Sequence, residues 1–198
     1  FDTNDKIIFY GRGSSGFDLS GENIQWHQNI YFSSNSCWLL IPDNSEESGK
    51  RIELETQPQS GTLIEYGLAF YHAESDLINL NASGTEWVGS PIFAGGSQPI
   101  LADLPDPKSG VNMSISARFR GHSVTETSTS YHELTLLHGS LNGDQIGSTM
   151  SWSGTASRTL SENTPDIFLD NGSNVFYIKN SSTDANSSPY LDYFEIQY

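Results

Sequence analysis

The residues of this chain with the chemistry of nucleophiles are one cysteine and many serines. Cys37 has a candidate base, His27, ten positions before it. A catalytic thiolate needs an exposed, electropositive setting, whereas Cys37 opens the apolar run Cys37-Trp38-Leu39-Leu40-Ile41 of an acidic chain. We therefore expect a buried free thiol, because free cysteine is among the most buried residue types.

A serine hydrolase triad has equally little support. Serine, histidine and aspartate are all present, but the sequence contains no Gly-x-Ser-x-Gly elbow. His132 and His138 are six residues apart on an expected strand, so they share one face, and an ordinary polar strand face accounts for both. The zinc spacings His-x-x-x-His and Cys-x-x-Cys are absent. The sequence predicts that the chain is not an enzyme.

Loop carboxylates are the candidates for metal ligands. We single out Asp103 and Asp106, while Asp2 with Asp5 and Asp170 with Asn171 form similar pairs. Calcium takes about 6–8 oxygen ligands, some of them loop carbonyls. No Asp-x-Asp-x-Asp-Gly run is present, and solvated turns explain each pair better. We expect no cofactor, and calcium at Asp103 and Asp106 is the one exception that the residues allow.

Three tryptophans, Trp26, Trp87 and Trp152, are candidates for stacking on sugar rings. They lie beside Gly, Ser, His or Glu, which allows partial exposure, whereas Trp38 lies in an apolar run and is expected in the core. Packing in or around the core is the alternative for each of the three. Asn-x-Ser/Thr sequons supply candidate N-glycosylation sites, if the source has that pathway: Asn81, Asn112, Asn171, Asn180 and Asn186.

The elements that must position these residues are strands. No segment repeats apolar residues at helical spacing over three turns, but alternation with period two recurs, most clearly from Val111 to Arg120. Asn142-Gly143 predicts an antiparallel hairpin, and Asn171-Gly172 predicts a turn. Residues 94–110 and 121–130 are expected as long loops. Further strands are expected at Lys6–Tyr10, Cys37–Ile41, Arg51–Thr56, Leu63–His72, Tyr131–His138, Asp144–Met150, Asn174–Asn180 and Leu191–Tyr198.

These elements predict an all-β fold: an antiparallel β-sandwich of jelly-roll type, galactose-binding-like, with long loops at one end. The 198 residues fit one domain spanning 1–198. A strand near the N-terminus and another at the C-terminus are typical of jelly rolls.

Charge and composition exclude several partners. Nine Lys and Arg face 24 Asp and Glu, a net charge of −15, so nucleic acid would be repelled. No stretch approaches the roughly 20 apolar residues of a membrane span, so membrane insertion is not expected. The chain starts at Phe1 without a visible signal peptide, and we expect a processed or excised piece. Its Ser, Asn, Thr and Gly are typical of exported β proteins, which predicts a secreted or cell-surface location.

Short segments along the chain resemble, in order, the β-sandwich domain that precedes the catalytic domain of gingipain-like secreted cysteine peptidases. The family's catalytic His and Cys belong to the separate domain, so the resemblance implies no catalytic residue here. It implies export from a bacterial cell envelope, often as one module of a larger surface protein. The matching segments are Ile7–Gly13, Trp26–Asn29, Cys37–Leu40, Gly49–Ile52, Glu74–Asp76, Ser83–Gly89, Arg120–Ser123, His132, Leu141–Gly143, Trp152–Gly154, Asn171–Val175 and Leu191–Tyr198.

We therefore expect a non-catalytic extracellular module with a structural or assembly role in a surface protein or an extracellular fibre (filament). Its partners would be other protein subunits or further domains of a larger protein. The terminal strands Lys6–Tyr10 and Leu191–Tyr198 are candidates for pairing with a neighbouring chain. Two alternatives stay open: a carbohydrate-binding module that uses Trp87 or Trp152 on glycans, and an accessory domain of a secreted peptidase.

Overall fold

The computed structural model describes residues 11–20, 23–29, 31–38, 67–108, 112–125, 129–165 and 169–198. The chain divides into two compact units, Phe1–Thr62 and Leu63–Tyr198, and the expectation of one domain over the whole chain stays a prediction. In the first unit, β1 (Gly16–Ser20) and β2 (Asn23–His27) pair antiparallel. The expected strands Lys6–Tyr10 and Arg51–Thr56 lie outside the described residues.

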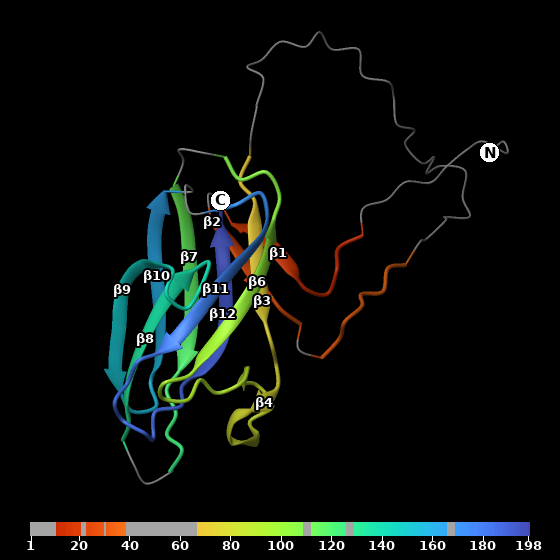
Figure 1. Cartoon of the computed structure of the whole chain (residues 1–198). Helices are drawn as coiled ribbons and strands as arrows, with labels where there is room; N and C mark the ends of the chain where they lie inside the picture. Colours follow the sequence, from red (N-terminus) through yellow and green to blue (C-terminus); the bar gives the residue numbers. More distant parts are fainter. Residues whose placement is uncertain are drawn as a thin grey trace, which may run out of the picture. The chain divides into compact units, whose positions relative to one another are not determined.

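The second unit is a sandwich of two four-stranded antiparallel sheets, ordered β10-β7-β12-β3 and β6-β11-β8-β9 (Figure 1). Numbered along the chain, the first, third, sixth and eighth of these strands form one sheet, and the second, fourth, fifth and seventh form the other. This alternation is jelly-roll topology, as expected. The strands are β3 (Phe70–Glu74), β6 (Ser97–Leu104), β7 (Asn112–Arg120), β8 (Tyr131–His138), β9 (Asp144–Ser153), β10 (Ser157–Pro165), β11 (Gly172–Asn180) and β12 (Tyr190–Gln197).

A small hairpin extends the second unit between β3 and β6. It pairs β4 (Ile78–Asn79) with β5 (Trp87–Val88), and a single 3-10 turn, η1 (Leu80–Ala82), connects the two strands. No helix among the described residues is long and apolar enough to cross a membrane.

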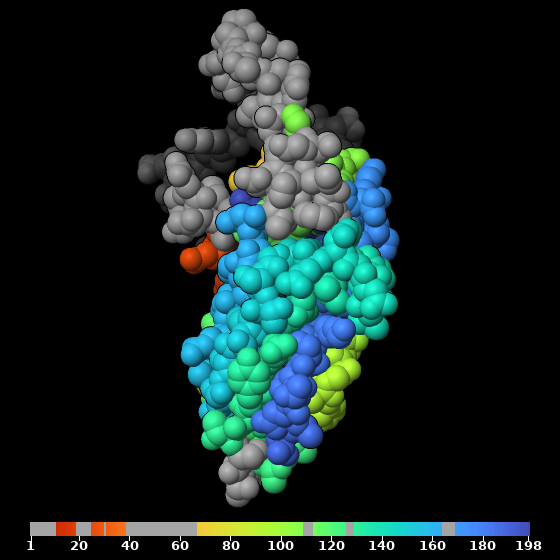
Figure 2. All heavy atoms as spheres, turned by 60° about the vertical axis from the view of Figure 1, so that its left-hand side comes forward, coloured from red at the N-terminus to blue at the C-terminus, as the bar shows by residue number. Residues whose placement is uncertain are grey.

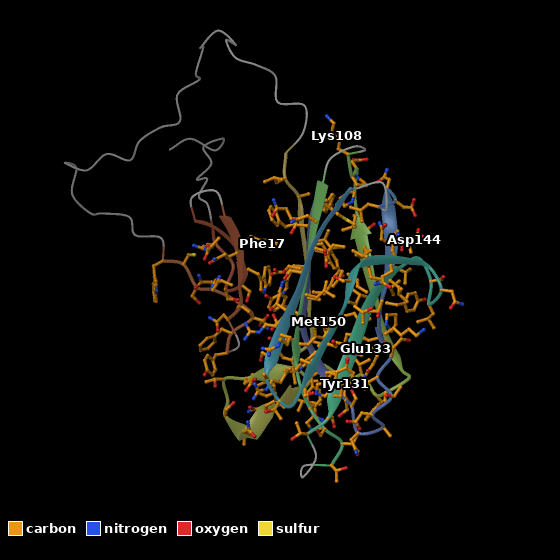
Figure 3. The ribbon with its side chains drawn as sticks, turned by 90° about the vertical axis from the view of Figure 1, so that its left-hand side faces the viewer. Phe17, Lys108, Tyr131, Glu133, Asp144 and Met150 are labelled. Carbon is orange, nitrogen blue, oxygen red and sulfur yellow. The ribbon has the colours of Figure 1, made fainter. Side chains whose placement is uncertain are left out.

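Alternating side chains build the core between the two sheets. On β7, Met113, Ile115, Ala117 and Phe119 are buried, as the period-two pattern predicts. The opposite layer contributes Phe176, whose ring centre lies 5.2 Å from that of Phe194 on β12. Figure 3 views the two layers from the side of β9, with Asp144 and Met150 labelled on that strand. The predicted Asn142-Gly143 hairpin is confirmed by the antiparallel pairing of β8 with β9.

One strand lies where a loop was expected. β6 occupies part of residues 94–110, with Ile100, Ala102 and Leu104 turned into the core. It is an edge strand, and the Leu101 carbonyl accepts a hydrogen bond of 2.7 Å from the Tyr71 hydroxyl on β3. That carbonyl therefore points away from β11. The backbone nitrogen of Pro99, two residues earlier, lies on the same unpaired side of the strand. Proline is tolerated there because no ladder hydrogen bond is lost.

The C-terminal strand is not an edge. β12 pairs with β7 on one side and with β3 on the other. The expectation that Leu191–Tyr198 pairs with a neighbouring chain is therefore wrong, because both of its hydrogen-bonding sides are occupied within the sheet.

Candidate functional site

The three tryptophan candidates have different surroundings. Trp152 on β9 is 6% exposed, and its ring lies against that of buried His132, with 4.8 Å between ring centres. It belongs to the core and is not available to stack on a sugar. Trp87 is partly buried on β5 and donates a hydrogen bond of 3.4 Å to the Gly84 carbonyl. Trp26, in the first unit, packs edge-on against Phe17 at 4.9 Å.

The expectation of a buried Cys37–Trp38 pair is wrong. Cys37 is exposed, and Trp38 is 90% exposed. Both residues lie outside any strand, so the apolar run that they open does not enter a core at this point. His27 lies 3.9 Å from Asp18 and lines a pocket of about 500 Å³ within the first unit, but Cys37 is not part of that lining.

Of the two proposed calcium ligands, Asp106 is hydrogen-bonded to the side-chain amide of Asn171. Asn171 Oδ1 accepts a hydrogen bond of 2.9 Å from the Asp106 N–H, and Asn171 Nδ2 donates one of 3.3 Å to Asp106 Oδ1. Asp103 is exposed on β6. Burial raises the pKa of Tyr198, and the charges of Asp103 and Asp106 raise it further. Within the part of the chain that the structure describes, no group of three or more His, Cys, Asp or Glu is arranged to hold a metal ion.

The sequons differ sharply in accessibility. Asn180 is 0% exposed, and its Nδ2 donates to the Ile92 carbonyl and to Ser187 Oγ, so it cannot carry a glycan in the folded protein. Asn81 is exposed in η1 with a positive φ of 56°, and Asn171 is also exposed. Asn186 is half-buried. Asn112 begins β7 opposite Pro165.

A buried polar network, which the sequence did not reveal, closes one end of the sandwich. Asn180 Nδ2 donates to Ser187 Oγ over 3.0 Å. His132 Nε2 lies 3.0 Å from the Gly154 carbonyl, which can only accept, so Nε2 carries the proton. The other ring nitrogen, Nδ1, therefore accepts from Ser187 Oγ over 2.9 Å. Burial lowers the pKa of His132, which keeps the ring neutral.

This serine–histidine pair is structural. His132 and Ser187 are both fully buried. In Figure 2 the blue atoms of the connection between β11 and β12 cover this lower end of the domain. The expectation that His132 and His138 share a face of β8 is confirmed, because both side chains point toward the core. That face is therefore the core face, not a polar one: the centre of the His138 ring lies 5.0 Å from that of the Phe176 ring. A nucleophile that no substrate can reach does no chemistry.

One group of apolar side chains lies on the outer face of the sheet β6-β11-β8-β9. Leu101 is 69% exposed and pairs with Val175. In the next row, Pro99 pairs with Tyr177, which pairs with Leu137. Directly paired residues of an antiparallel sheet share a face, so these five side chains lie on one face, which we call the apolar band. Leu101 and Pro99 are exposed there, Val175 and Tyr177 are half-buried, and Leu137 is buried.

A pocket of about 190 Å³ adjoins the apolar band between the edge strands β3 and β6. Figure 1 shows these two strands side by side, and the hydrogen bond from Tyr71 to Leu101 joins them. We call it the edge pocket. Its lining mixes apolar and polar groups, among them Tyr71, Glu74, Gln98, Ile100, Leu101 and Asp192.

The charges at the edge pocket are mainly negative. Asp192 Oδ2 lies 3.1 Å from Arg118 Nε. Burial raises the pKa of Asp192 to about 6; Arg118 opposes the rise, and the charges of Glu74, Asp76 and Glu86 add to it. The ionised form of this carboxyl is thus disfavoured in the isolated chain.

Glu74 is also part of a second charged group. His72 lies 2.9 Å from Glu195 through Nδ1 and 3.1 Å from Glu74 through Nε2. Burial alone would lower the pKa of His72, but hydrogen bonds to Glu195 and Glu74 outweigh it and raise the pKa. Carboxylates only accept, so both ring nitrogens donate when His72 is an imidazolium.

No known family model matches the sequence, and no curated protein matches it. Among solved structures, dimeric latent PorU from Porphyromonas gingivalis matches with a TM-score of 0.64 and 16% identity, over 96% of this chain and 18% of the PorU chain. This chain has the fold of a part of PorU. The resemblance to the β-sandwich domain of gingipain-like peptidases is thus confirmed in its fold. The chain spans less than a fifth of PorU's length.

Two carbohydrate-binding modules are more distant. A family 36 module in complex with calcium and xylotriose has a TM-score of 0.37 and 16% identity, over 65% of this chain and 98% of that module. A family 35 module from Clostridium thermocellum has a TM-score of 0.35 and 19% identity, over 65% of this chain and 90% of that module. TM-scores this low do not establish a common fold with these modules.

Proposed function

We propose that this chain is a non-catalytic module of a larger secreted or cell-surface protein, and that it holds a protein partner against the apolar band. The observation that carries the proposal is the exposure of one edge of that band: Leu101 is 69% exposed and Pro99 is exposed, next to the half-buried Val175 and Tyr177. Exposed apolar patches rimmed by polar residues are typical of protein–protein contacts. The fit of nearly the whole chain to a small part of PorU supports its role as one module among several.

The chemistry of the partner follows from charge. The chain carries −15, and the carboxylates Asp103 and Glu133 lie on the same sheet as the band, on β6 and β8 (Figure 3 for Glu133). A second copy of the chain would bring an equally acidic surface to the contact. A partner with an apolar centre and basic residues around it complements the face instead, because complementary charges favour encounter and select against like-charged surfaces.

Carbohydrate binding has weaker support. Of the three tryptophans that were candidates for stacking on glycans, Trp152 lies in the core and Trp26 packs edge-on against Phe17. Trp87 is a single, partly buried ring whose N–H is bonded to Gly84. The docking of a protein partner therefore accounts better for the exposed side chains than the binding of a glycan does.

Site-specific photo-crosslinking in the native host tests the proposal. A benzoylphenylalanine placed at Leu101 should give one discrete protein adduct at the cell surface. The matched control is the same probe at Leu141, an apolar residue that is 44% exposed on the turn between β8 and β9. The adduct at Leu101 should be absent at Leu141 and should disappear when Val175→Asp is added.

Three results would overturn the proposed function. One is equal adduct formation at Leu101 and Leu141, which indicates random collision. Another is an adduct at Leu101 that Val175→Asp leaves unchanged. The third is retention of the chain on a glycan array that Trp87→Ala abolishes, which would favour the carbohydrate-binding module.

A further inference from the structure

Two connections of the sandwich meet at the end of the domain that the network of His132 closes. One is residues 121–125, which follow β7, and the other is residues 181–189 between β11 and β12. Backbone hydrogen bonds join them, such as the bond of 3.0 Å from the Ser188 N–H to the His122 carbonyl. We call these two connections the closed end.

His132 fits the closed end only as a neutral ring. Its Nε2 must donate, because the Gly154 carbonyl 3.0 Å away can only accept, and its Nδ1 accepts a hydrogen bond from the Ser187 hydroxyl over 2.9 Å. A proton on Nδ1 would turn this acceptor into a second donor, and the Ser187 hydroxyl would lose its acceptor. Asn180 Nδ2 already donates to the same oxygen over 3.0 Å, so that oxygen would be surrounded by donors in a fully buried site.

The charged groups that act on His132 do not compensate for a buried positive ring. Asp184 favours protonation of the ring, His122 opposes it, and the ring's neighbour on β9, Trp152, is uncharged. Asp184 is also engaged elsewhere, because its Oδ2 accepts the Tyr131 N–H over 2.9 Å. Burial is the largest effect and holds the pKa of His132 below its ordinary value. The buried ring therefore stays neutral, whereas a ring exposed to water takes up a proton in mild acid.

The three other histidines of the second unit tolerate a proton where they lie. Both nitrogens of His72 donate to carboxylates when the ring is charged, so acid stabilises that site. His122 Nδ1 lies 2.8 Å from Ser188 Oγ, whose hydroxyl donates to the His122 carbonyl, so Nδ1 is the donor and a proton on Nε2 leaves this bond intact. His138 Nε2 bonds the amide oxygen of Asn174, which requires a protonated Nε2. The bonds of these three rings permit the charged form that the network of the closed end excludes.

We propose that the closed end is a pH-sensitive closure, which opens in mildly acid solution because His132 must leave Ser187 and Gly154 before Nδ1 can take up a proton from the solvent. The rest of the sandwich stays folded, since His72 holds its two carboxylates more firmly when it is charged. The inference goes beyond the proposed function and does not depend on it, because no residue of the apolar band belongs to the closed end.

Hydrogen exchange of the full 198-residue chain tests the closure. Mass spectrometry follows the exchange at pH 7.5 and pH 5.5, and each rate is divided by the intrinsic rate at that pH. An exposed histidine binds a proton below about pH 6.5, so an opening that takes up one proton becomes about tenfold more frequent between the two pH values. The protection of residues 181–189 should fall by that factor, and the protection of β7 and β12 should not fall.

Two variants assign the effect to the ring. His132→Asn removes the titrating group and keeps an amide oxygen that can accept from Ser187, so the fall in protection should disappear. The matched control, His122→Gln, changes a histidine of the closed end whose bond withstands protonation, and it should leave the fall unchanged. Nitrogen-15 resonance of the unsubstituted protein provides a second readout that needs no variant to fold: at pH 7.5 it should show His132 as the neutral tautomer with the proton on Nε2.

Four results would overturn the proposal. The first is equal protection of residues 181–189 at the two pH values. The second is an equal fall in β7 and β12, which would indicate unfolding of the whole sandwich. The third is a fall that His122→Gln abolishes. The fourth is a His132 ring with its proton on Nδ1 at pH 7.5, because Nδ1 would then donate to Ser187 and the charged ring would keep that bond.

Discussion

Replacing Ser187 by alanine should destabilise the sandwich strongly, although the change removes a single oxygen atom. That oxygen donates to His132 Nδ1 and accepts from Asn180 Nδ2. Ser187, His132 and Asn180 are all 0% exposed, so water cannot replace either bond. Each buried group left without its partner is unfavourable by about 1–3 kcal/mol, so the loss of two partners by Ser187→Ala should lower the free energy of unfolding by roughly 2–6 kcal/mol.

The control for this variant lies in the same connection. Ser181 is exposed, and its Oγ donates to Glu133 Oε1 over 2.8 Å. Ser181→Ala should change the free energy of unfolding by no more than about 0.5 kcal/mol, as surface substitutions usually do.

Equilibrium unfolding in urea at pH 7.5 measures both variants. Fluorescence of Trp152, whose ring touches His132, reports on the network. The comparison is sound where the slope of free energy against urea is unchanged. If Ser187→Ala and Ser181→Ala are equally stable, the network does not hold this end of the domain and the argument from buried hydrogen bonds fails.

Three further predictions concern charge and backbone geometry. The pKa of His72 is raised in the folded protein, so protonation of the ring stabilises the fold below the pKa of the unfolded chain, about 6.5, and this stabilisation is lost as the pH rises through the folded pKa. His72→Gln should therefore lower the urea midpoint more at pH 5.5 than at pH 9. An equal loss at the two pH values would contradict this. The pKa of Asp192 is raised to about 6, so its negative charge destabilises the fold at neutral pH. Asp192→Asn should stabilise the protein by about 1–2 kcal/mol at pH 8, after allowance for solvent screening, and by little at pH 4. A destabilised variant at pH 8 would show that the ion pair with Arg118 dominates. Gly147 has a φ of 64°, and a Cβ there would overlap the Glu162 side chain, so Gly147→Ala should lower the melting temperature. Adding Glu162→Ala should restore only part of the loss, because the left-handed backbone at position 147 would still cost about 1–2 kcal/mol. Full restoration would show that the backbone is not strained.

The strands with clear alternation could be predicted from the sequence, and those without it could not. β8 has the predicted bounds Tyr131–His138, and β7 was expected from its alternation. β6 was not predicted because Pro99 argues against a strand, unless that strand is known to lie at the edge of a sheet. β10 was missed because its middle is polar, with Leu160 as its buried apolar residue.

The candidate site could be predicted only in part. Glu74 and Leu191-Asp192 belong to segments that resemble the gingipain-like domain, but nothing local indicates that they meet Gln98, since three strands far apart in sequence bring them together. Apolar neighbours in sequence also misled the prediction for Trp38: a run of apolar residues implies a core only if a second layer covers it. Trp152 shows the converse, because its polar neighbours Ser151 and Ser153 point outward from β9 while the ring points in.

Both borders of the sheet that carries the apolar band resist lengthening by further strands. On β6, Pro99 offers no N–H and the Leu101 carbonyl is capped by Tyr71. On β9, the kink at Gly147 lets Glu162 accept the Ser148 N–H over 3.3 Å. Copies of this module can therefore be held close together without their sheets joining edge to edge into a continuous cross-β ribbon.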